Sequence, residues 1–449
     1  MRKSTIVLIA ISLPVLIILA LIFWPKATVT PPPQTKLTIW GFASQTEMQG
    51  VLATYRAQSP YVSTTYVQVQ ESTFKETLLK EWALGQGPDV VMVPSQQLVE
   101  YQPFLSPAPA TITQYTFATQ KTLGIKEETT VTQSTVAGPT PEFLRQNYID
   151  TVVNDAVIAQ KVYGLPLTVD TLVLFSNRDL LNQAQIALPA ATWEQFVQQV
   201  PRLTIVDANA NLIQSGAALG TSDNILHAQD ILALILMQNG SEVVDPSSGQ
   251  ANLTADASTI QALNFYTDFA RISKTIYSWN EEQEEALNAF AAGKIGYYIG
   301  FSADDATIKQ RSVGLNYDIT AAPQISTQHP VNISSYTLAT VAKSSNNQNV
   351  AWGFVSFITN KNNSAVYANA SFKTPMRKDL LNQLITEQGT SIYGILAGQA
   401  LTARNWYRGP NYEKAQAILS DLITTTLGGS LALETINSAN QQLRLIQKQ

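Results

Sequence analysis

The chain has no cysteine and only two histidines among its 449 residues. The lack of cysteine excludes disulfides, thiolate metal sites and a cysteine nucleophile. The two histidines, His227 and His329, do not have the spacing of metal ligands, so we expect no metal site. No phosphate-binding loop occurs either, and we expect no cofactor.

Positive charge is also scarce. The chain has 28 Lys and Arg against 33 Asp and Glu, which gives a formal net charge of −5. Nothing in this balance attracts a phosphate backbone, so we expect no nucleic-acid partner. Charged residues at 14% and hydrophobic residues at 45% are typical of a globular protein. The length predicts two or three domains.

Motifs of hydrolytic enzymes are missing or incomplete. No Gly-x-Ser-x-Gly sequence occurs. Residues 72–75 and 222–224 match two motifs of penicillin-recognising serine enzymes, but the third motif, Lys-Thr-Gly, is absent. The sequence therefore gives no support for a serine hydrolase of these kinds.

The N-terminus contains a long apolar run. Residues 6–24 are nineteen residues without a charge, and as a helix they span about 28 Å, close to the hydrocarbon thickness of a bilayer. Arg2 and Lys3 precede the run, which predicts a cytoplasmic stub at residues 1–5 and all the rest on the outer side. The run predicts an uncleaved membrane anchor, with a cleaved signal peptide as the alternative. Residues 25–35, rich in proline, suit a stiff linker.

Strand and helix patterns alternate after this linker. An apolar strand at 37–40 precedes a helical stripe made by Met48, Val51, Leu52 and Tyr55. Alternation of Thr65, Val67 and Val69 predicts a half-buried strand, followed by a helix over 74–82 and a buried strand over 89–93. This order predicts an α/β fold with a mostly parallel sheet. Residues 104–149, rich in Thr, Pro, Gln and Ala, interrupt it as an insertion.

Several short motifs occur in a fixed order. They are KLTIWG at 36–41, GQGPDVV at 85–91, TWEQF at 192–196, AFAAGKIG at 289–296 and AWGFVSF at 351–357, with KVYGLPLTVDTLVLFSNRDLL at 161–181. In this order they resemble the extracellular solute-binding proteins of ABC importers, the sugar-binding family that includes maltose-binding proteins. The family usually carries a lipid-modified cysteine as its anchor, and this chain has none.

The resemblance implies a two-lobed periplasmic-binding-protein fold of type II with a central cleft. The first lobe is expected to comprise residues 36–168 and 322–370, and the second residues 172–317 and 374–449. The chain would cross between the lobes near 169–171, 318–321 and 371–373. Ligands of such folds bind in the cleft between the lobes.

The resemblance also implies a set of ligand-binding residues. Asp170 is an acid within an apolar strand, which is costly to bury unless something pairs with it, so it is either a structural ion-pair partner or a ligand contact. Trp406 is the main candidate for packing against the apolar face of a sugar ring. The other candidates lie on loops that face the cleft in the family: Phe42, Ser44, Gln45, Ser95, Gln96, Tyr298, Phe301, Ser335, Tyr336 and Tyr407. Hydroxyl and amide groups among them suit sugar hydroxyls.

The function implied is capture of a carbohydrate, an oligosaccharide as the first guess, and its delivery to an ABC permease by hinge closure. We expect a monomer tethered to the cell membrane, with its binding domain outside. Two alternatives stay open. One is a surface adhesin or sensor domain with the same fold. The other is a glycoside hydrolase that uses paired carboxylates such as Asp170 and Asp305.

Overall fold

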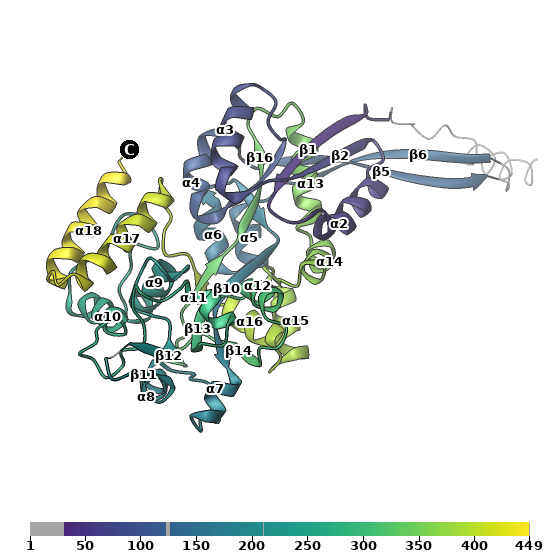
Figure 1. Cartoon of the computed structure of the whole chain (residues 1–449). Helices are drawn as coiled ribbons and strands as arrows, with labels where there is room; N and C mark the ends of the chain where they lie inside the picture. The colour runs from purple at the N-terminus through teal and green to yellow at the C-terminus, as the bar shows by residue number, and fades with distance from the viewer. Residues whose placement is uncertain (1–30, 123–125, 210, 449) are drawn as a thin grey trace, which may run out of the picture.

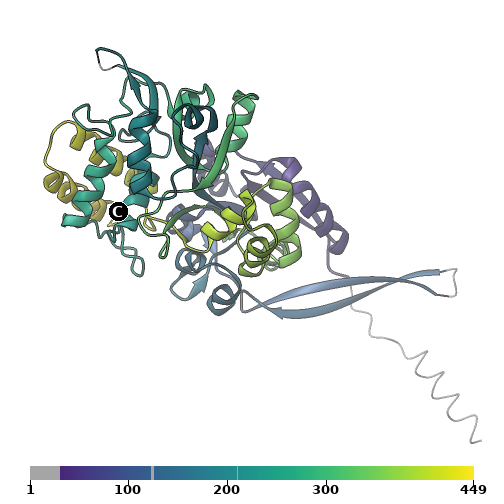
Figure 2. The same cartoon turned by 90° about the horizontal axis from the view of Figure 1, so that it is seen from below.

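The computed structural model describes residues 31–122, 126–209 and 211–448. Two lobes lie next to each other, and a long arm extends from one of them (Figures 1 and 2). The predicted membrane segment at 6–24 lies outside the described residues. Within the described ranges, no helix is both long enough and apolar enough to cross a bilayer.

The first lobe is built on a sheet with the strand order β2-β1-β3-β16-β4. The strands are β1 (Thr35–Gly41), β2 (Val62–Gln68), β3 (Val90–Pro94), β4 (Leu105–Ser106) and β16 (Thr337–Ala342), and β9 (Gly164–Pro166) also pairs with β16. Strand β1 is parallel to β2 and β3, whereas β16 runs antiparallel to β3. The predicted α/β alternation and parallel pairing are therefore confirmed for the first three strands.

Helices and short elements complete this lobe. They are α2 (Gln45–Gln58), η1 (Glu71–Thr73), α3 (Phe74–Ala83), η2 (Ser95–Gln97), α4 (Leu98–Tyr101), η3 (Gln102–Phe104), α5 (Pro141–Asn147), α6 (Asp150–Ala156), β7 (Val157–Ile158), β8 (Lys161–Val162), α13 (Gln348–Ile358) and α14 (Lys361–Ser371). The predicted stripe on α2 is confirmed, because Met48, Val51, Leu52 and Tyr55 are its buried residues.

One predicted strand turns its other face to the core. In β2, Tyr66 is buried, whereas Thr65 and Val67 are exposed. The prediction that Thr65 and Val67 lie on the buried face is therefore wrong. Alternating side chains point to opposite faces, so a shift of one residue exchanges the two sets. This shift places the phenol of Tyr66 on the inner face.

The second lobe has a sheet with the order β11-β12-β13-β10-β15-β18, and β14 pairs with β10 off this path. Its strands are β10 (Thr168–Asn177), β11 (Ile205–Val206), β12 (Leu212–Ala217), β13 (Ile295–Phe301), β14 (Tyr317–Ala321), β15 (Asn332–Ser335) and β18 (Ala403–Arg404). Its helices are α7 (Arg178–Gln183), α8 (Trp193–Leu203), α9 (Ala228–Gln238), α10 (Ala257–Asp268), α11 (Ala286–Ala291), α12 (Asp304–Arg311), α17 (Tyr412–Leu427) and α18 (Ala432–Ile446). Thr192 caps α8, because its side chain accepts from the backbone N–H of Gln195.

Strand β10 joins the two lobes. Its first two residues pair with β17 (Thr374–Pro375), Asp170 and Thr171 pair with β15, and the remainder pairs with β13 and β14. Val169 belongs to the hydrophobic core of the first lobe and Leu172 to that of the second. One continuous strand therefore carries the chain from one core to the other.

The other crossings differ from the predicted ones. Ala322 and Ile333 pack in the second core, and Tyr336 is the next residue in the first, so the chain returns between β15 and β16 and not at 318–321. Met376 and Leu381 still pack in the first core, so the chain has not crossed at 371–373. Helices α15 (Lys378–Gln388) and α16 (Ile392–Ala400) follow, and Trp406 lies in the second core.

The insertion forms the arm. Strands β5 (Thr111–Thr122) and β6 (Lys126–Ala137) pair antiparallel along their whole length. At about 3.4 Å per residue the hairpin is about 40 Å long, and both views show it projecting away from the first lobe (Figures 1 and 2). The side chain of Asn349 on α13 bonds both the backbone N–H and the carbonyl oxygen of Thr113, at 3.1 Å each, and this fixes the base of the arm.

Candidate solute-binding cleft

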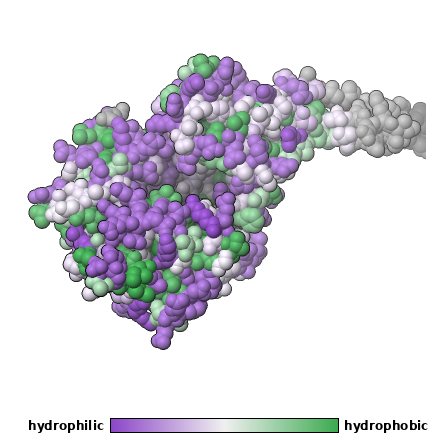
Figure 3. Space-filling model, viewed as in Figure 1, coloured by the Kyte–Doolittle hydropathy of each residue, from purple (hydrophilic) through white to green (hydrophobic). Residues whose placement is uncertain are grey.

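A hollow of about 300 Å³ lies where the lobes meet. Figure 3 shows the molecule recessed between its two halves. The lining combines residues of the first lobe, the strand β10 that joins the lobes, and Ala303 and Ser335 of the second lobe. In full, it is made by Phe42, Ala43, Met48, Tyr66, Glu71, Met92, Pro94, Leu167, Thr168, Asp170, Ala303, Ser335, Tyr336, Thr337, Tyr367 and Lys373. We take this hollow, the cleft, as the candidate site because both lobes contribute to it.

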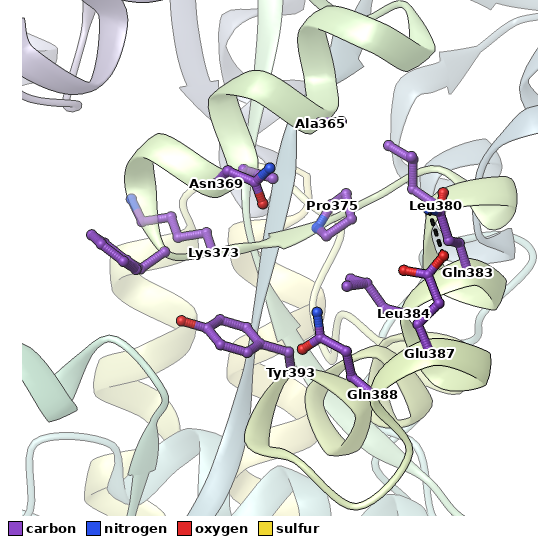
Figure 4. Close-up of a pocket in the computed structure, with 12 residues that line it drawn as sticks. Ala365, Asn369, Lys373, Pro375, Leu380, Gln383, Leu384, Glu387, Gln388 and Tyr393 are labelled. Atoms are coloured by element: carbon purple, nitrogen blue, oxygen red, sulfur yellow. Dashed lines mark hydrogen bonds between the residues drawn. The ribbon is translucent and has the colours of Figure 1, made fainter.

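A larger hollow, of about 460 Å³, lies elsewhere (Figure 4). Its lining comes from residues 365–393 alone, which form α14, β17, α15 and the start of α16. Ala368 and Leu380 are among the apolar groups there, and the amide of Gln383 bonds the carboxylate of Glu387 at 2.9 Å. A ligand in this hollow would contact one continuous stretch of chain and would not join the two lobes.

Aromatic rings form the first-lobe wall of the cleft. The hydroxyl of Tyr66 donates to the carbonyl oxygen of Ala43 at 2.7 Å, which fixes the ring against the end of β1. Gly41 permits this approach, because a Cβ there would lie 2.8 Å from the Tyr66 hydroxyl. Phe42 stands beside it, edge-on to Phe74 with ring centroids 4.9 Å apart. Rings of this kind offer flat apolar faces to a ligand.

Two further tyrosines, Tyr336 and Tyr367, line the same wall. Burial raises the pKa of Tyr336 and of Tyr367, with the neighbouring acids Asp155 and Glu47 respectively as further causes. Burial likewise raises the pKa of Tyr66. All three phenols therefore stay protonated at neutral pH and keep an O–H group.

Asp170 stands at the junction of the lobes. Its Oδ1 accepts from the backbone N–H of Thr171 at 2.8 Å and from the N–H and hydroxyl of Ser302 at 2.9 and 2.5 Å, and its Oδ2 accepts from the N–H of Ala303 at 3.0 Å. Burial raises the pKa of Asp170, and the hydrogen bonds from Ser302 and Ala303 oppose that rise. The carboxylate therefore ties β10 to the start of α12, and it also lines the cleft.

A second polar cluster lies next to the cleft and is fully enclosed. Asp155 of α6 is 4% exposed, and its Oδ2 accepts from Tyr336 and Asn405 at 2.5 Å each and from Thr151 at 3.2 Å. Its Oδ1 has no hydrogen-bond partner in the described chain, and Arg408 Nε lies 3.9 Å away. Burial raises the pKa of Asp155 from 3.8 to about 6. Asn405 and Arg408 follow β18, so this cluster also bridges the lobes.

The rim of the cleft carries opposite charges. Lys373 is exposed and pairs with Glu47 of α2, with 3.7 Å between Nζ and Oε1. Glu71 lines the same hollow from η1, directly before α3. Exposed pairs of this kind contribute little to stability. They leave the rim without a strong net charge, which favours a neutral ligand over an ion.

Comparison with known proteins identifies the family of the chain. Residues 42–365 match the family model described as bacterial extracellular solute-binding protein. The chain belongs to this family. Members bind solutes and are not enzymes, so the expectation of a binding protein is confirmed. The glycoside hydrolase alternative also lacks a paired site, because Asp305 bonds Tyr317 and Lys309 and does not line the cleft.

Curated relatives are distant. A galactooligosaccharide-binding protein of Bacillus subtilis is 24% identical over 316 residues, which cover 68% of this chain and 64% of the relative. A binding protein of Brucella abortus is 21% identical over 238 residues, 52% of this chain and 55% of the relative. The solute-binding protein thus spans between half and two thirds of these relatives.

Solved structures share the fold over almost the whole chain. The cyclic α-maltosyl-1,6-maltose-binding protein of Arthrobacter globiformis superimposes with a TM-score of 0.72 at 16% identity, covering 93% of this chain and all of that one (100%). An ABC transporter solute-binding protein of Thermotoga lettingae, bound to α-D-tagatose, superimposes with a TM-score of 0.67 at 17% identity. The match covers 92% of this chain and 99% of that one. The predicted two-lobed α/β fold is therefore confirmed.

The cleft of the solute-binding protein brings together four of the predicted site residues: Phe42, Asp170, Ser335 and Tyr336. Two others lie near it with their side chains already engaged. Ser44 caps α2 by accepting from the N–H of Glu47, whose carboxylate accepts in return from the N–H of Ser44. Gln45 donates to the carbonyl oxygen of Tyr66 at 3.0 Å.

Ser95 and Gln96 lie in the enclosed polar cluster and not in the cleft. Ser95 is 3% exposed and accepts from Asn405 at 2.9 Å, and Gln96 is 7% exposed and reaches the carbonyl oxygen of Ser334 at 3.5 Å. The short helix η2 after β3 therefore uses its polar side chains to hold the lobes together. In this arrangement a solute has no access to them.

The predicted aromatic contacts of the second lobe lie in its core. Trp406 is 1% exposed, and its indole N–H donates to Asp230 at 2.7 Å. Tyr407 is fully buried, and the hydroxyl of the fully buried Tyr298 donates to Asp304 at 2.8 Å. Phe301 is half-buried against His227, with ring centroids 4.9 Å apart. None of these four side chains lines the cleft.

Several lining residues were not predicted. Tyr66 was assigned to the wrong face of β2, and Tyr367 and Lys373 lie far along the chain from the motifs near Phe42. Met92 comes from a strand that the sequence marks only as buried. A correct choice of the buried face of β2 would have identified Tyr66. No local signal distinguishes Tyr367 from a core tyrosine.

Proposed function

We propose that the protein binds a neutral carbohydrate in the cleft, as an extracytoplasmic receptor that delivers the sugar to an ABC permease. The cleft supports this proposal by placing flat rings beside a carboxylate and hydroxyl groups. Phe42, Tyr66 and Tyr367 offer apolar faces, and Asp170 and Ser335 offer polar edges. A pyranose ring has the same division, with apolar faces and a periphery of hydroxyls.

The single observation that carries the proposal is the position of Asp170. It binds backbone N–H groups of the second lobe and lines a hollow made mainly by the first. A solute hydroxyl that donates to this carboxylate would therefore be connected to both lobes. Contacts to both lobes favour the closed state, which is the state that we propose the permease recognises.

Relatives suggest which sugars to test. One curated relative is named for galactooligosaccharides, and structural neighbours hold maltotetraose and α-D-tagatose. The volume of about 300 Å³ lies at the lower end of the range for ligand sites. We therefore propose a short oligosaccharide as the solute.

A thermal-shift screen of the purified protein against these sugars tests the proposal. A sugar at 100 times its dissociation constant should stabilise the protein by about 2.7 kcal/mol. The shift should disappear in Asp170→Ala and persist in Asp305→Ala, which changes an acid outside the cleft. Shifts that are equal in both variants, or no shift with any carbohydrate, would contradict the proposal.

Membrane attachment and transport are further parts of the proposal. We propose that residues 6–24 hold the protein in the membrane and keep it close to its permease. Deletion of residues 1–24 should then move the protein from the membrane fraction to the soluble fraction. Sugar uptake by proteoliposomes that contain a cognate permease should require the protein. Sugar binding without such uptake would favour the adhesin or sensor alternative.

A further inference from the structure

A third hollow, of about 340 Å³, lies outside the cleft, where the arm leaves the first lobe. Its walls come from the end of α2, the following loop, the first half of β5 and one face of α13. These elements lie together at the base of the arm in Figure 1. The base is held firmly by the two bonds between Asn349 and Thr113. We call this hollow the arm-base pocket.

The arm-base pocket is aromatic and uncharged. Five of its lining residues are aromatic, and none carries an ionisable acid or base of the Asp, Glu, Lys or Arg type. The ring of Tyr61 meets Tyr115 edge-on at 5.4 Å and 74°, and it stacks on Phe117 at 5.8 Å and 28°. The rings therefore stand at different angles and form the walls of a cup.

Polar groups around the cup are free to bind a ligand. The exposed side chains of Gln58, Gln114 and Thr116 make no hydrogen bond to any other residue that the structure describes. An amide both donates and accepts, and a hydroxyl does the same. The pocket thus joins flat apolar faces to neutral donors and acceptors without a buried charge.

The arm-base pocket is separate from the cleft. Met48 lines the cleft and Tyr55 lines the arm-base pocket, and both lie on the buried face of α2. They are seven positions apart along the helix, which is about 10 Å. A ligand in one hollow therefore has contacts of its own and does not depend on a ligand in the other.

We propose that the arm-base pocket is a second carbohydrate site, which takes part of a neutral glycan chain at the outer surface of the first lobe. Uncharged lining excludes recognition of phosphate, uronate or a charged peptide by ion pairing. A polyproline segment is the other class of ligand that binds aromatic grooves. Such a segment fits between parallel aromatic ridges, whereas the rings here stand at 28° and 74° to one another. The geometry therefore favours a glycan.

Hydrogen exchange measured by mass spectrometry locates such binding without any need to know the natural ligand. The full chain is purified without sugars or sugar-based detergents and mixed with maltoheptaose or cellohexaose at about 10 mM, well above the Kd of a weak site near 1 mM. We expect slower exchange in residues 55–61 and 113–117 with at least one of the two probes. Protection should persist in Asp170→Ala, because Asp170 does not line the arm-base pocket.

Variants distinguish the pocket from a general effect. Gln58→Ala combined with Gln114→Ala removes two exposed side chains that make no hydrogen bond within the described part of the protein. The double variant should need about ten times more glycan for the same protection. The control, Gln261→Ala, removes an exposed glutamine of α10 and should change nothing. Tyr115→Ala should abolish the protection, with circular dichroism as a check on folding. The proposal is overturned if neither glycan protects the two segments, if the double variant behaves as the control does, or if a proline-rich peptide protects them and the glycans do not.

Discussion

Two aspartates join the lobes, and they do so in different surroundings. Asp170 lies at the edge of the cleft and accepts hydrogen bonds from backbone N–H groups of the second lobe. One of these donors, Ala303, is exposed. Asp155 is enclosed, holds Tyr336 and Asn405, and has one oxygen without a hydrogen bond. Water or a solute can replace a partner of Asp170 while the fold persists. The partners of Asp155 can leave only if the lobes separate.

This contrast assigns different roles to the two carboxylates. A carboxylate at an edge that water reaches can contribute to ligand affinity, because it can accept hydrogen bonds from water in the free state and from the solute in the bound state. An enclosed carboxylate contributes to the energy of the contact between the lobes and makes that contact dependent on pH. The following variants test the division, beginning with the largest expected effect.

Asn405→Ala should destabilise the protein most, by about 4 kcal/mol at pH 7. It removes a donor to the charged Asp155 and two bonds to Ser95 and Ser334, and bonds to charged groups are worth more than neutral ones. Denaturant unfolding measures the loss. Asn264→Ala, which removes an exposed side chain from α10, is the control and should have almost no effect. An equal loss in both variants would contradict a specific role for the cluster.

Asp155→Asn should remove a part of the unfolding free energy that depends on pH. Burial raises the pKa of Asp155 from 3.8 to about 6, and a shift of this size corresponds to about 3 kcal/mol. The raised pKa means that the folded state binds the proton more tightly than the unfolded state does. Stability from this group is therefore complete below pH 4 and is lost as pH rises through 6. The difference in unfolding free energy between wild type and variant should shrink over that window. A difference that is constant from pH 4 to pH 7 would refute this account.

Asp170→Ala should weaken sugar binding about 100-fold, because a bond from a solute hydroxyl to a charged acceptor is worth about 2.7 kcal/mol. Calorimetric titration gives the affinity and a melting curve gives the stability. The melting temperature should fall less than in Asn405→Ala: the N–H group of the buried Thr171 loses its acceptor, but water can reach the freed N–H group of Ala303. A large fall in melting temperature with unchanged affinity would make Asp170 a purely structural group like Asp155.

Phe42→Leu should have the smallest effect, about a fivefold loss of sugar affinity. Leucine keeps apolar volume but lacks the flat face that packs on a pyranose, and aromatic packing adds about 1 kcal/mol beyond area. Leu188→Ala, at a residue 75% exposed in the second lobe, is the control for a surface change. Affinity that is unchanged in Phe42→Leu would remove the ring from the site.

Periodicity in the sequence predicts the elements of the first lobe well. The spacing of Met48, Val51, Leu52 and Tyr55 allows only one helical face, and the structure has it. Periodicity fails for β2, because both faces of that strand carry residues with high β-propensity. Tyr66 was overlooked as a result. The arm was also missed, although its Thr-rich halves pair for twelve residues each.

The site was predictable only where it coincides with a local signal. An acid within an apolar strand marks Asp170, and the end of β1 marks Phe42. Trp406 shows the limit, because its indole N–H is taken by Asp230, 176 residues away in sequence, and no local pattern reveals that bond. Tyr367 likewise reaches the cleft only because α14 packs beside α2. Such contacts depend on tertiary packing, which residue spacing does not encode.

The hinge closure proposed above would bend the molecule in the middle of a β-strand and not in a loop. Strand β10 keeps a ladder partner from Thr168 to Asn177 and exchanges β17 for β15 and then β13 and β14. Closure of the lobes would then be a change in strand twist at this exchange of partners, and it would break no backbone hydrogen bond. The part of the molecule that bends will then be among the slowest to exchange its amide protons, and mobility in the usual sense will not reveal it.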